Sequence, residues 1–243
     1  MKNLTIALAI YRSLIISASL LALSPLAVNA GDLDEPTIQM VTAPILDWSG
    51  SYVGGYLTYG DGSYQQASSI DGIGLDVDVD GLGFGVRYGR NWQNSAAVFG
   101  FDVSLQSGID GITPKGSTNA TYTWTCGSGH CNVSIEALMT VRGRYGKVFG
   151  DGKTMAYGAL GLAAGTIEGG IFNSIQQGSS TALGYTTGIG LEHKYTDRIS
   201  IFGEVNYVDL GDIEFGTDNR GQGAPFFGRG DFTKFEMGFN YHF

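Results

Sequence analysis

The sequence is poor in the residues that build most catalytic and metal-binding sites. Its 243 residues include two cysteines and three histidines. His130, His193 and His242 fall in different parts of the predicted fold, so no nucleophile and base can be placed within hydrogen-bond reach of each other. Zinc strongly prefers four ligands, more than the two thiols and His130 supply. We therefore expect no enzyme activity, no metal site and no cofactor.

Long apolar runs, proline and basic residues are also scarce. After the first 30 residues, no apolar run reaches the roughly 20 residues that a membrane-spanning helix needs. A membrane protein without such helices has to form a closed β-barrel, because open sheet edges stay unsatisfied in hydrocarbon. Only 5 prolines accompany 39 glycines, which suits many long strands, since proline removes a donor from the sheet. The net charge of -9 argues against a nucleic-acid partner.

The N-terminal segment predicts export. Residues 1–30 combine two basic residues with an apolar run that is too short for a lasting membrane helix, and they end at the small residue Ala30. This is the pattern of a secretory signal peptide. Residues 31–47 show no periodicity and predict a flexible periplasmic lead-in. The rest of the chain, residues 48–243, is the predicted barrel domain.

Runs of alternating apolar and polar side chains predict eight β-strands. Successive side chains of a strand point to opposite faces, so each run has one apolar face. The runs are residues 48–59, 81–89, 97–105, 133–145, 155–166, 183–192, 199–207 and 235–243. Short polar turns alternate with longer connections at about 60–80, 106–132, 169–181 and 211–231, as in outer-membrane barrels. The predicted fold class is all-β, an eight-stranded transmembrane up-and-down antiparallel barrel with both chain ends on the periplasmic side.

Charged residues of these runs fall almost entirely on the face opposite to the apolar one. They are Arg87, Asp102, Glu136, Arg142, Arg144, Glu192, Glu204, Lys234 and Glu236. An Arg or Lys that faces lipid at the bilayer midplane costs about 2–4 kcal/mol, whereas opposite charges can pair inside. An eight-stranded lumen is just wide enough for side chains to fill it. We expect a packed, salt-bridged interior; the inward glycines leave space, so a narrow channel is the alternative.

The two cysteines, Cys126 and Cys131, lie in the second long connection with glycines between them. In an exported protein, two cysteines this close most simply form a disulfide that closes a small loop. We expect this disulfide to stiffen the tip of a surface hairpin.

Asp76, Asp78 and Asp80 resemble the first half of a calcium-binding loop. Arg87 stands where that motif requires a bidentate glutamate, so we interpret the run as an acidic strand end, with loose binding of divalent cations as the alternative. The valines in this run have odd numbers, whereas the next apolar residues have even numbers. A β-bulge is therefore expected near Gly81, since glycine tolerates a bulge best.

Aromatic residues gather near the predicted strand ends. They are Trp48, Tyr52, Tyr59, Trp92, Tyr145, Phe149, Tyr195, Tyr207, Tyr241 and Phe243. Aromatic girdles at the two membrane interfaces explain this placement, and core packing in a soluble sandwich is the alternative.

The chain resembles the small outer-membrane β-barrel proteins of alphaproteobacteria, which are OmpA-like in architecture and include porin-family surface antigens. The resemblance rests on Trp48-Ser-Gly-Ser-Tyr52-Val-Gly-Gly, on residues 196–211 and on the terminal Phe243. It implies a location in the bacterial outer membrane, among its lipids and lipopolysaccharide. It also implies insertion by the barrel-assembly machinery with the help of periplasmic chaperones, and an assembly signal formed by Phe239, Tyr241 and Phe243.

Three functions are compatible with this resemblance. We expect a surface barrel with a mainly structural role in envelope integrity and in external contacts. The first alternative is a small porin-like diffusion channel. The second is a surface ligand binder or adhesin for haemin or a host molecule, for which His130 is the one histidine placed outside.

Overall fold

The structure, a computed structural model, describes residues 46–67, 75–112, 130–171, 177–216 and 226–243. All of them belong to one compact unit, Thr42–Phe243, and a second unit, Met1–Val41, lies outside the described residues. The predicted signal peptide and most of the predicted lead-in also lie outside them and stay predictions. Within the described ranges, no helix is long and apolar enough to cross a membrane.

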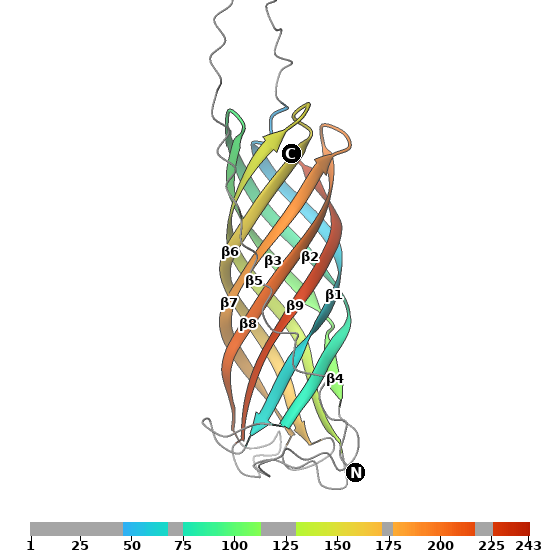
Figure 1. Cartoon of the computed structure of the whole chain (residues 1–243), viewed down its shortest axis with the longest axis vertical. Coiled ribbons are helices and arrows are strands. Elements are labelled where there is room, and N and C mark those ends of the chain that lie inside the picture. The colour runs from blue at the N-terminus through green and yellow to red at the C-terminus, as the bar shows by residue number, and fades with distance from the viewer. Residues whose placement is uncertain (1–45, 68–74, 113–129, 172–176, 217–225) are drawn as a thin grey trace, which may run out of the picture. The chain divides into compact units, whose positions relative to one another are not determined.

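The described residues form a wall of eight antiparallel strands (Figure 1). The elements are β1 (Gly50–Ala67), β2 (Leu75–Asn94), β3 (Ala97–Ser107), β4 (Asp110–Ile112), β5 (Cys131–Phe149), β6 (Thr154–Ile171), β7 (Gln177–Lys194), β8 (Ile199–Phe215) and β9 (Phe226–His242). The short β4 continues β3, because both pair with β2 on one side and β5 on the other. Gly108, with a φ of 84°, lies at the break between them.

The wall closes on itself because β1 pairs with both β2 and β9. Leu57, for example, is opposite Phe84 on one side and Met237 on the other. Each of the strands from β2 to β8 pairs with the strands before and after it along the chain, when β3 and β4 are counted as one strand. Each strand therefore has a hydrogen-bonded neighbour on both of its edges. The predicted all-β, eight-stranded up-and-down barrel is confirmed.

The two ends of the barrel differ in their connections. At one end, which we call the turn end, short turns join β2 to β3, β5 to β6 and β7 to β8, and the chain enters β1 and leaves β9 (Figure 1). At the other end, which we call the loop end, the connections run through residues outside the described ranges. Both chain ends of the barrel therefore lie at the turn end, as the strand count predicts.

Large apolar side chains cover the outside of only the half of the barrel near the turn end. On β1 the exposed ones are Val53, Leu57 and Tyr59, and on β2 they begin at Leu82 and continue to Trp92. All exposed large apolar residues of the other strands lie in the same half. We call this half of the outer surface the apolar belt. Its segments overlap the eight runs that alternation predicts, but on β5 the exposed apolar residues begin at Met139 and not at Val133.

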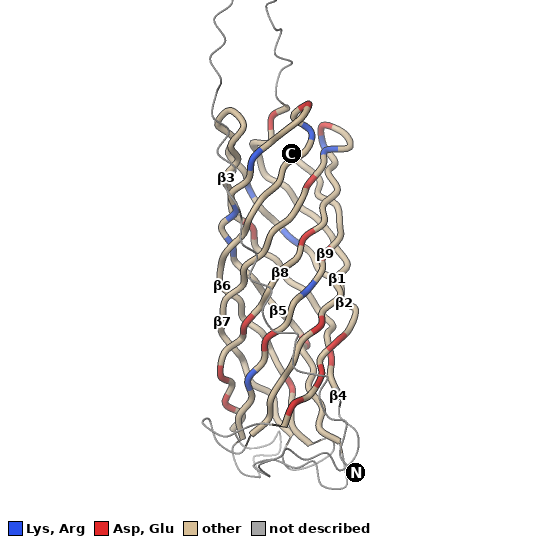
Figure 2. Tube along the Cα trace, in the orientation of Figure 1, with Lys and Arg blue, Asp and Glu red and all other residues tan. Residues whose placement is uncertain are grey.

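The strands continue past the apolar belt toward the loop end. β1 has 18 residues and β2 has 20, whereas a tilted strand needs roughly 9–11 to cross a bilayer. Much of the connections expected at residues 60–80 and 211–231 is therefore strand. The outer surface there is acidic, with Asp76, Asp78 and Asp80 exposed on β2; Figure 2 shows acidic residues concentrated toward the loop end.

The inside of this half holds an apolar cluster that we call the loop-end core. Its buried residues are Tyr64, Leu75, Val77, Val79, Ile109, Cys131, Val133, Ile135, Leu138, Ala163, Ile167, Ala182, Val208, Leu210, Ile213, Phe215, Phe226 and Phe232. The rings of Phe215 and Phe226 stack with their centroids 4.5 Å apart. The polarity of the wall is thus reversed between its two halves: apolar outside near the turn end, apolar inside near the loop end.

This reversal corrects the bulge predicted near Gly81. The pairing of β1 with β2 continues through Gly81 without a shift, and burial alternates evenly along the strand. Val77 and Val79 point inward, whereas Leu82 points outward. The register stays the same along the strand, and the apolar residues change sides because the medium outside the wall changes. A bulge does occur on β5, where the pairing with β6 shifts between Ile135 and Ala137.

Tyrosine rings fill the space that the inward glycines leave. Tyr157 on β6 lies opposite Gly190 on β7, and a Cβ atom added to Gly190 would come within 2.6 Å of the ring. Tyr56 lies in the same way over Gly85 of β2, where an added Cβ would come within 2.3 Å. These two inward glycines therefore accommodate aromatic rings inside the lumen.

Replacing Gly190 by valine is expected to lower the free energy of unfolding by about 1–3 kcal/mol, because the new side chain displaces the Tyr157 ring. The measurement is the urea midpoint of the protein in lipid vesicles. Gly143→Val is the matched control, since an added Cβ at this outward position of β5 meets only the Leu160 carbonyl oxygen, at 3.9 Å. Equal midpoints for the two variants would contradict the packing role of Gly190.

Candidate functional site

The part of the lumen inside the apolar belt contains an ionic network centred on Glu204 of β8. This carboxylate is 3% exposed and accepts hydrogen bonds from Arg87 of β2, Arg142 of β5 and the hydroxyl of Tyr157. The Tyr157 oxygen is 2.6 Å from Oε2 of Glu204, and Nη1 of Arg87 is 3.5 Å from the same oxygen. Donors from three strands thus compensate the burial of one carboxylate.

Each arginine of this centre also binds a second carboxylate. Arg142 donates from Nε and Nη2 to the two oxygens of Asp102, at 2.8 and 3.1 Å. Such a two-point contact fixes the guanidinium plane as well as its charge. Arg87 donates to Glu236 at 2.7 Å, and Lys234 lies 2.6 Å from the other oxygen of Glu236. The network therefore extends across β2, β3, β5, β8 and β9.

A second centre forms around Glu192 of β7, nearer the turn end. Arg144 donates to it at 2.8 Å, and Ser200 and Asn240 donate to its other oxygen at 2.5 and 2.8 Å. Nε2 of His242 lies 3.5 Å from that same oxygen. The Arg144 guanidinium stacks over the Tyr157 ring, 3.9 Å from its centroid, so Tyr157 joins the two centres.

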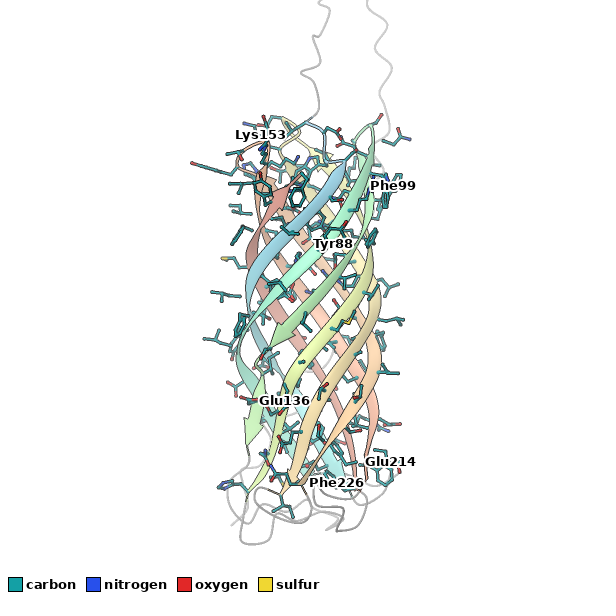
Figure 3. The ribbon with its side chains drawn as sticks, turned by 180° about the vertical axis from the view of Figure 1, so that it is seen from behind. Tyr88, Phe99, Glu136, Lys153, Glu214 and Phe226 are labelled. Carbon is teal, nitrogen blue, oxygen red and sulfur yellow. The ribbon has the colours of Figure 1, made fainter. Side chains whose placement is uncertain are left out.

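The structure places eight of the nine predicted lumen charges in these two centres. They are Arg87, Asp102, Arg142, Arg144, Glu192, Glu204, Lys234 and Glu236, and all are buried. Glu136 is the correction: it lies at the β5 bulge, is exposed, and is found toward the loop end in Figure 3. The bulge lets Ile135 and Leu138 both point inward and turns Glu136 outward. Val133 and Ile135, expected on the outward face, are buried.

Sequence reasoning missed the neutral partners of the network. Tyr157 lies in the Ala- and Gly-rich run with the weakest alternation, which hid its inward position. Asn206 accepts from Arg142 at 2.8 Å, and Gln106 accepts from Lys234 at 2.5 Å. Both share the inward parity of the predicted charges, and this signal could have identified them.

The network has no net charge when its groups are ionised. Arg87, Arg142, Arg144 and Lys234 supply the cations, and Asp102, Glu192, Glu204 and Glu236 supply the anions. Each cation is held by at least one carboxylate at 3.5 Å or less. Such a layer offers no fixed charge of one sign to attract ions into the barrel, and its side chains cross the lumen.

Trp48 closes the turn end of the lumen. Its side chain is fully buried beside Val98, Val148 and Met155, and its indole Nε1 donates to the carbonyl of Gly152 at 2.9 Å. The edge of the indole meets the His242 ring, with the centroids 6.1 Å apart. Trp48, two residues before the start of β1, therefore folds back into the mouth of the barrel.

Lys194 holds the backbone just before Trp48. Its ammonium donates to the carbonyl of Asp47 at 2.7 Å and lies 5.1 Å from the centre of the indole ring. The Ser49 amide donates to the Asp47 carboxylate at 2.8 Å, and this hydrogen bond lowers the pKa of that carboxyl group. These contacts tie the start of the barrel chain to its mouth.

Trp48 and Tyr52 correct the predicted aromatic girdle, because both are fully buried in the lumen. The other members lie outside: Tyr59, Trp92, Tyr145, Phe149, Tyr195, Tyr241 and Phe243 are exposed, and Tyr207 is half-buried. Alternation in the sequence could not separate the two groups, since an aromatic residue at a strand end gives the same pattern whether its ring points inward or outward.

The remaining predicted residues lie at opposite ends of the barrel. Phe239, Tyr241 and Phe243 are exposed near the turn end, and their assembly role stays a prediction.

Cys131 is buried at the loop end of β5, and Cys126 lies outside the described residues, so the disulfide stays a prediction. His130 directly precedes β5 and is half-buried. Among the described residues, no group of three or more His, Cys, Asp or Glu could hold a metal ion.

Comparisons with known proteins agree with this architecture. The family model described as outer membrane protein beta-barrel domain matches residues 18–243. A 22 kDa outer membrane protein of Rhizobium leguminosarum bv. viciae is 31% identical over 182 residues, which cover 73% of this chain and 74% of that protein. A 25 kDa outer-membrane immunogenic protein of Brucella ovis is 30% identical over 201 residues, 81% of this chain and 88% of that protein.

The chain also matches solved structures at low sequence identity. Neisserial surface protein A is 14% identical with a TM-score of 0.45, and the match covers 80% of this chain and 98% of that one. From the family match and the curated relatives, the chain belongs to the outer-membrane β-barrel family. Its location is the bacterial outer membrane. In such barrels short turns face the periplasm, so the turn end is periplasmic and the loop end is external.

Replacing Arg142 by methionine is expected to lower the free energy of unfolding by about 3–5 kcal/mol, because Asp102 and Glu204 lose a buried partner. The measurement is the urea midpoint in vesicles. The control is Lys153→Met, which removes an exposed ion pair at a turn and should change stability by less than about 1 kcal/mol.

A second variant tests whether the loss comes from the stranded carboxylate. Adding Asp102→Asn to Arg142→Met removes one unpaired charge, so part of the lost stability should return. If Arg142→Met matched the Lys153→Met control, the ionic network would have no structural role.

Proposed function

We propose that this protein is a closed structural barrel of the outer membrane, which supports envelope integrity and presents its loop end to external contacts. The observation that carries the proposal is the filling of the lumen along its whole described length. The Trp48 side chain fills the periplasmic mouth, the ionic network fills the part inside the apolar belt, and the loop-end core fills the external half.

The external half is the strongest argument against the alternative of a diffusion channel. A water-filled channel needs polar walls, whereas this part of the lumen is lined by packed apolar side chains. The cavity beside Tyr64, Val133 and Phe232 measures about 10 Å³, close to the minimum that a single water molecule requires. Polar solutes would have to displace a packed core.

The position of the acidic outer wall supports a role in external contacts. β1 and β2 extend beyond the apolar belt, so the described loop end of these strands lies beyond the lipid. Glu214 of β8 points outward in this region, as Figure 3 shows. The name of the Brucella ovis relative states that it is immunogenic, and recognition by an immune system requires an accessible surface. A ligand, haemin or a host molecule, would then bind at the loops.

A structural role requires no enzymatic chemistry, and the names of the curated relatives state none. The partners that we propose are outer-membrane lipids and lipopolysaccharide around the wall. During biogenesis they are the barrel-assembly machinery and periplasmic chaperones, which would read Phe239, Tyr241 and Phe243 in β9. All three side chains are exposed on the outer face, where such factors could contact them.

Planar-bilayer recording tests the closed lumen. Folded protein, identified by heat-modifiable gel mobility, is expected to give no sustained openings above the protein-free baseline, because no continuous polar path crosses the loop-end core. Bilayers that receive heat-unfolded protein serve as the control. Reproducible openings in the nanosiemens range from the folded protein would favour the diffusion channel.

A deletion strain tests the structural role. Cells that lack the protein are expected to take up more of a hydrophobic fluorescent dye and to grow less well in detergent, and the full-length chain should restore both. A chain without Phe243, expected to insert poorly, is the matched control and should restore less. Unchanged dye uptake and detergent tolerance in the deletion strain would contradict a role in envelope integrity.

A further inference from the structure

An apolar groove crosses the outer surface of the barrel within the apolar belt. It measures about 940 Å³, within the range of roughly 300–1,000 Å³ that is typical of ligand pockets. Its outward lining includes Leu57 of β1, Met237 of β9 and Leu191 of β7, together with a single cation, Lys147 of β5. Inward residues such as Thr58, Tyr157 and Glu204 also line it, each between two outward lining residues of its own strand. The groove therefore runs over the outer, lipid-facing side of these strands.

The groove follows the direction of the cross-strand hydrogen bonds. Leu57, Met237, Gly203, Leu191, Ala156 and Lys147 are successive partners from β1 through β9, β8, β7 and β6 to β5. The next outward row runs parallel to it, from Tyr59 through Phe235, Val205, Ile189 and Gly158 to Tyr145. The groove thus lies between two adjacent rows of side chains on six neighbouring strands.

Missing side chains make the groove deep near β6 and β8. A Cβ atom added to Gly203 would meet nothing within 4 Å, and one added to Gly158 would meet only the Gly188 carbonyl, at 3.8 Å. Ala156, two residues before Gly158 on β6, adds only a methyl group. Leu191 and Met237 belong to the row of Gly203 and form one bank, and Ile189 and Phe235 in the next row form the other.

The groove rises from the periplasmic rim toward the middle of the membrane. Lys147 lies close to the end of β5 at Phe149, directly beside the turn end. Gly203 lies further from the turn end on β8, which starts at Ile199, and Leu57 lies further still on β1, which starts at Gly50. One end is therefore at headgroup depth and the other is in the hydrocarbon.

We propose that this groove binds one phospholipid of the inner leaflet, with the phosphate at Lys147 and an acyl chain along Ala156, Gly158 and Gly203. Charge complementarity supports the headgroup assignment, since a lysine ammonium is a common phosphate ligand. Lys147 is exposed, and no carboxylate of the described residues lies within ion-pair distance of it. The apolar lining supports the acyl chain, and the groove continues the lipid-facing surface of the belt.

Native mass spectrometry tests the site. The full chain is reconstituted in phosphatidylethanolamine vesicles that contain phosphatidylglycerol, extracted in mild detergent, and its retained lipids are counted. The folded wild-type protein is expected to keep one phospholipid. Filling the groove with Gly158→Leu and Gly203→Leu should abolish this retention. The control is Gly143→Leu, which adds the same side chain at an outward position of β5 that does not line the groove.

The headgroup contact has its own variant. Lys147→Gln is expected to lower phosphatidylglycerol retention about fivefold, the value of one lysine near an anionic lipid surface. Lys153→Gln, at the neighbouring turn, is the matched control and should leave retention unchanged. Heat-modifiable gel mobility verifies that each variant is folded before its lipids are counted.

Two results would overturn the assignment. If the groove-filled variant retained as much phospholipid as the wild type, the lipid would be bound elsewhere on the belt. If the wild type instead formed a dimer that groove filling dissolved, a second copy of the chain would occupy the groove. Neither result would bear on the closed lumen, because conductance is measured independently.

Discussion

Closure of the sheet is the constraint on which the rest of this structure depends. In hydrocarbon, each backbone N–H and C=O needs a partner within the protein, so β1 has to pair with both β2 and β9. Closing with eight strands fixes a narrow lumen, and the alternation of side chains sends every second residue into it. The side chains that enter this space have to be specific, because each buried group needs either a close-packed neighbour or a polar partner.

The lumen is filled differently along the barrel because the medium outside changes. Where lipid surrounds the wall, the apolar residues point outward and the inward positions carry ions such as Arg142 and Glu204, which compensate each other. Beyond the lipid, water surrounds the wall, so Asp78 and Asp80 point outward and Val79 points inward. The same strand carries both patterns without a change of register. Within the membrane the barrel is thus apolar outside and ionic inside. Beyond the membrane it is polar outside and apolar inside, like a water-soluble protein.

The filled interior and the lipid-facing exterior use glycine in opposite ways. Inward glycines such as Gly190 lie directly under tyrosine rings, so the missing side chain allows tight packing and the Tyr157 hydroxyl reaches Glu204. Outward glycines such as Gly203 have no protein neighbour, so the missing side chain leaves a groove for lipid. Tyr157, Gly190 and Gly203 lie on the neighbouring strands β6, β7 and β8. The same strands therefore carry the packed ring inside the lumen and the groove on the lipid-facing side.

The sequence by itself determined the strand count, the apolar belt and the inward position of eight charges, because lipid imposes a strict two-residue period on each strand. Tertiary structure decided the rest. Glu136 turned outward because of a bulge that depends on the pairing of β5 with β6. Trp48 entered the periplasmic mouth because β5, β6 and β7 meet there. The partners of Arg142 come from strands far apart in the chain, and only closure of the sheet brings them within reach.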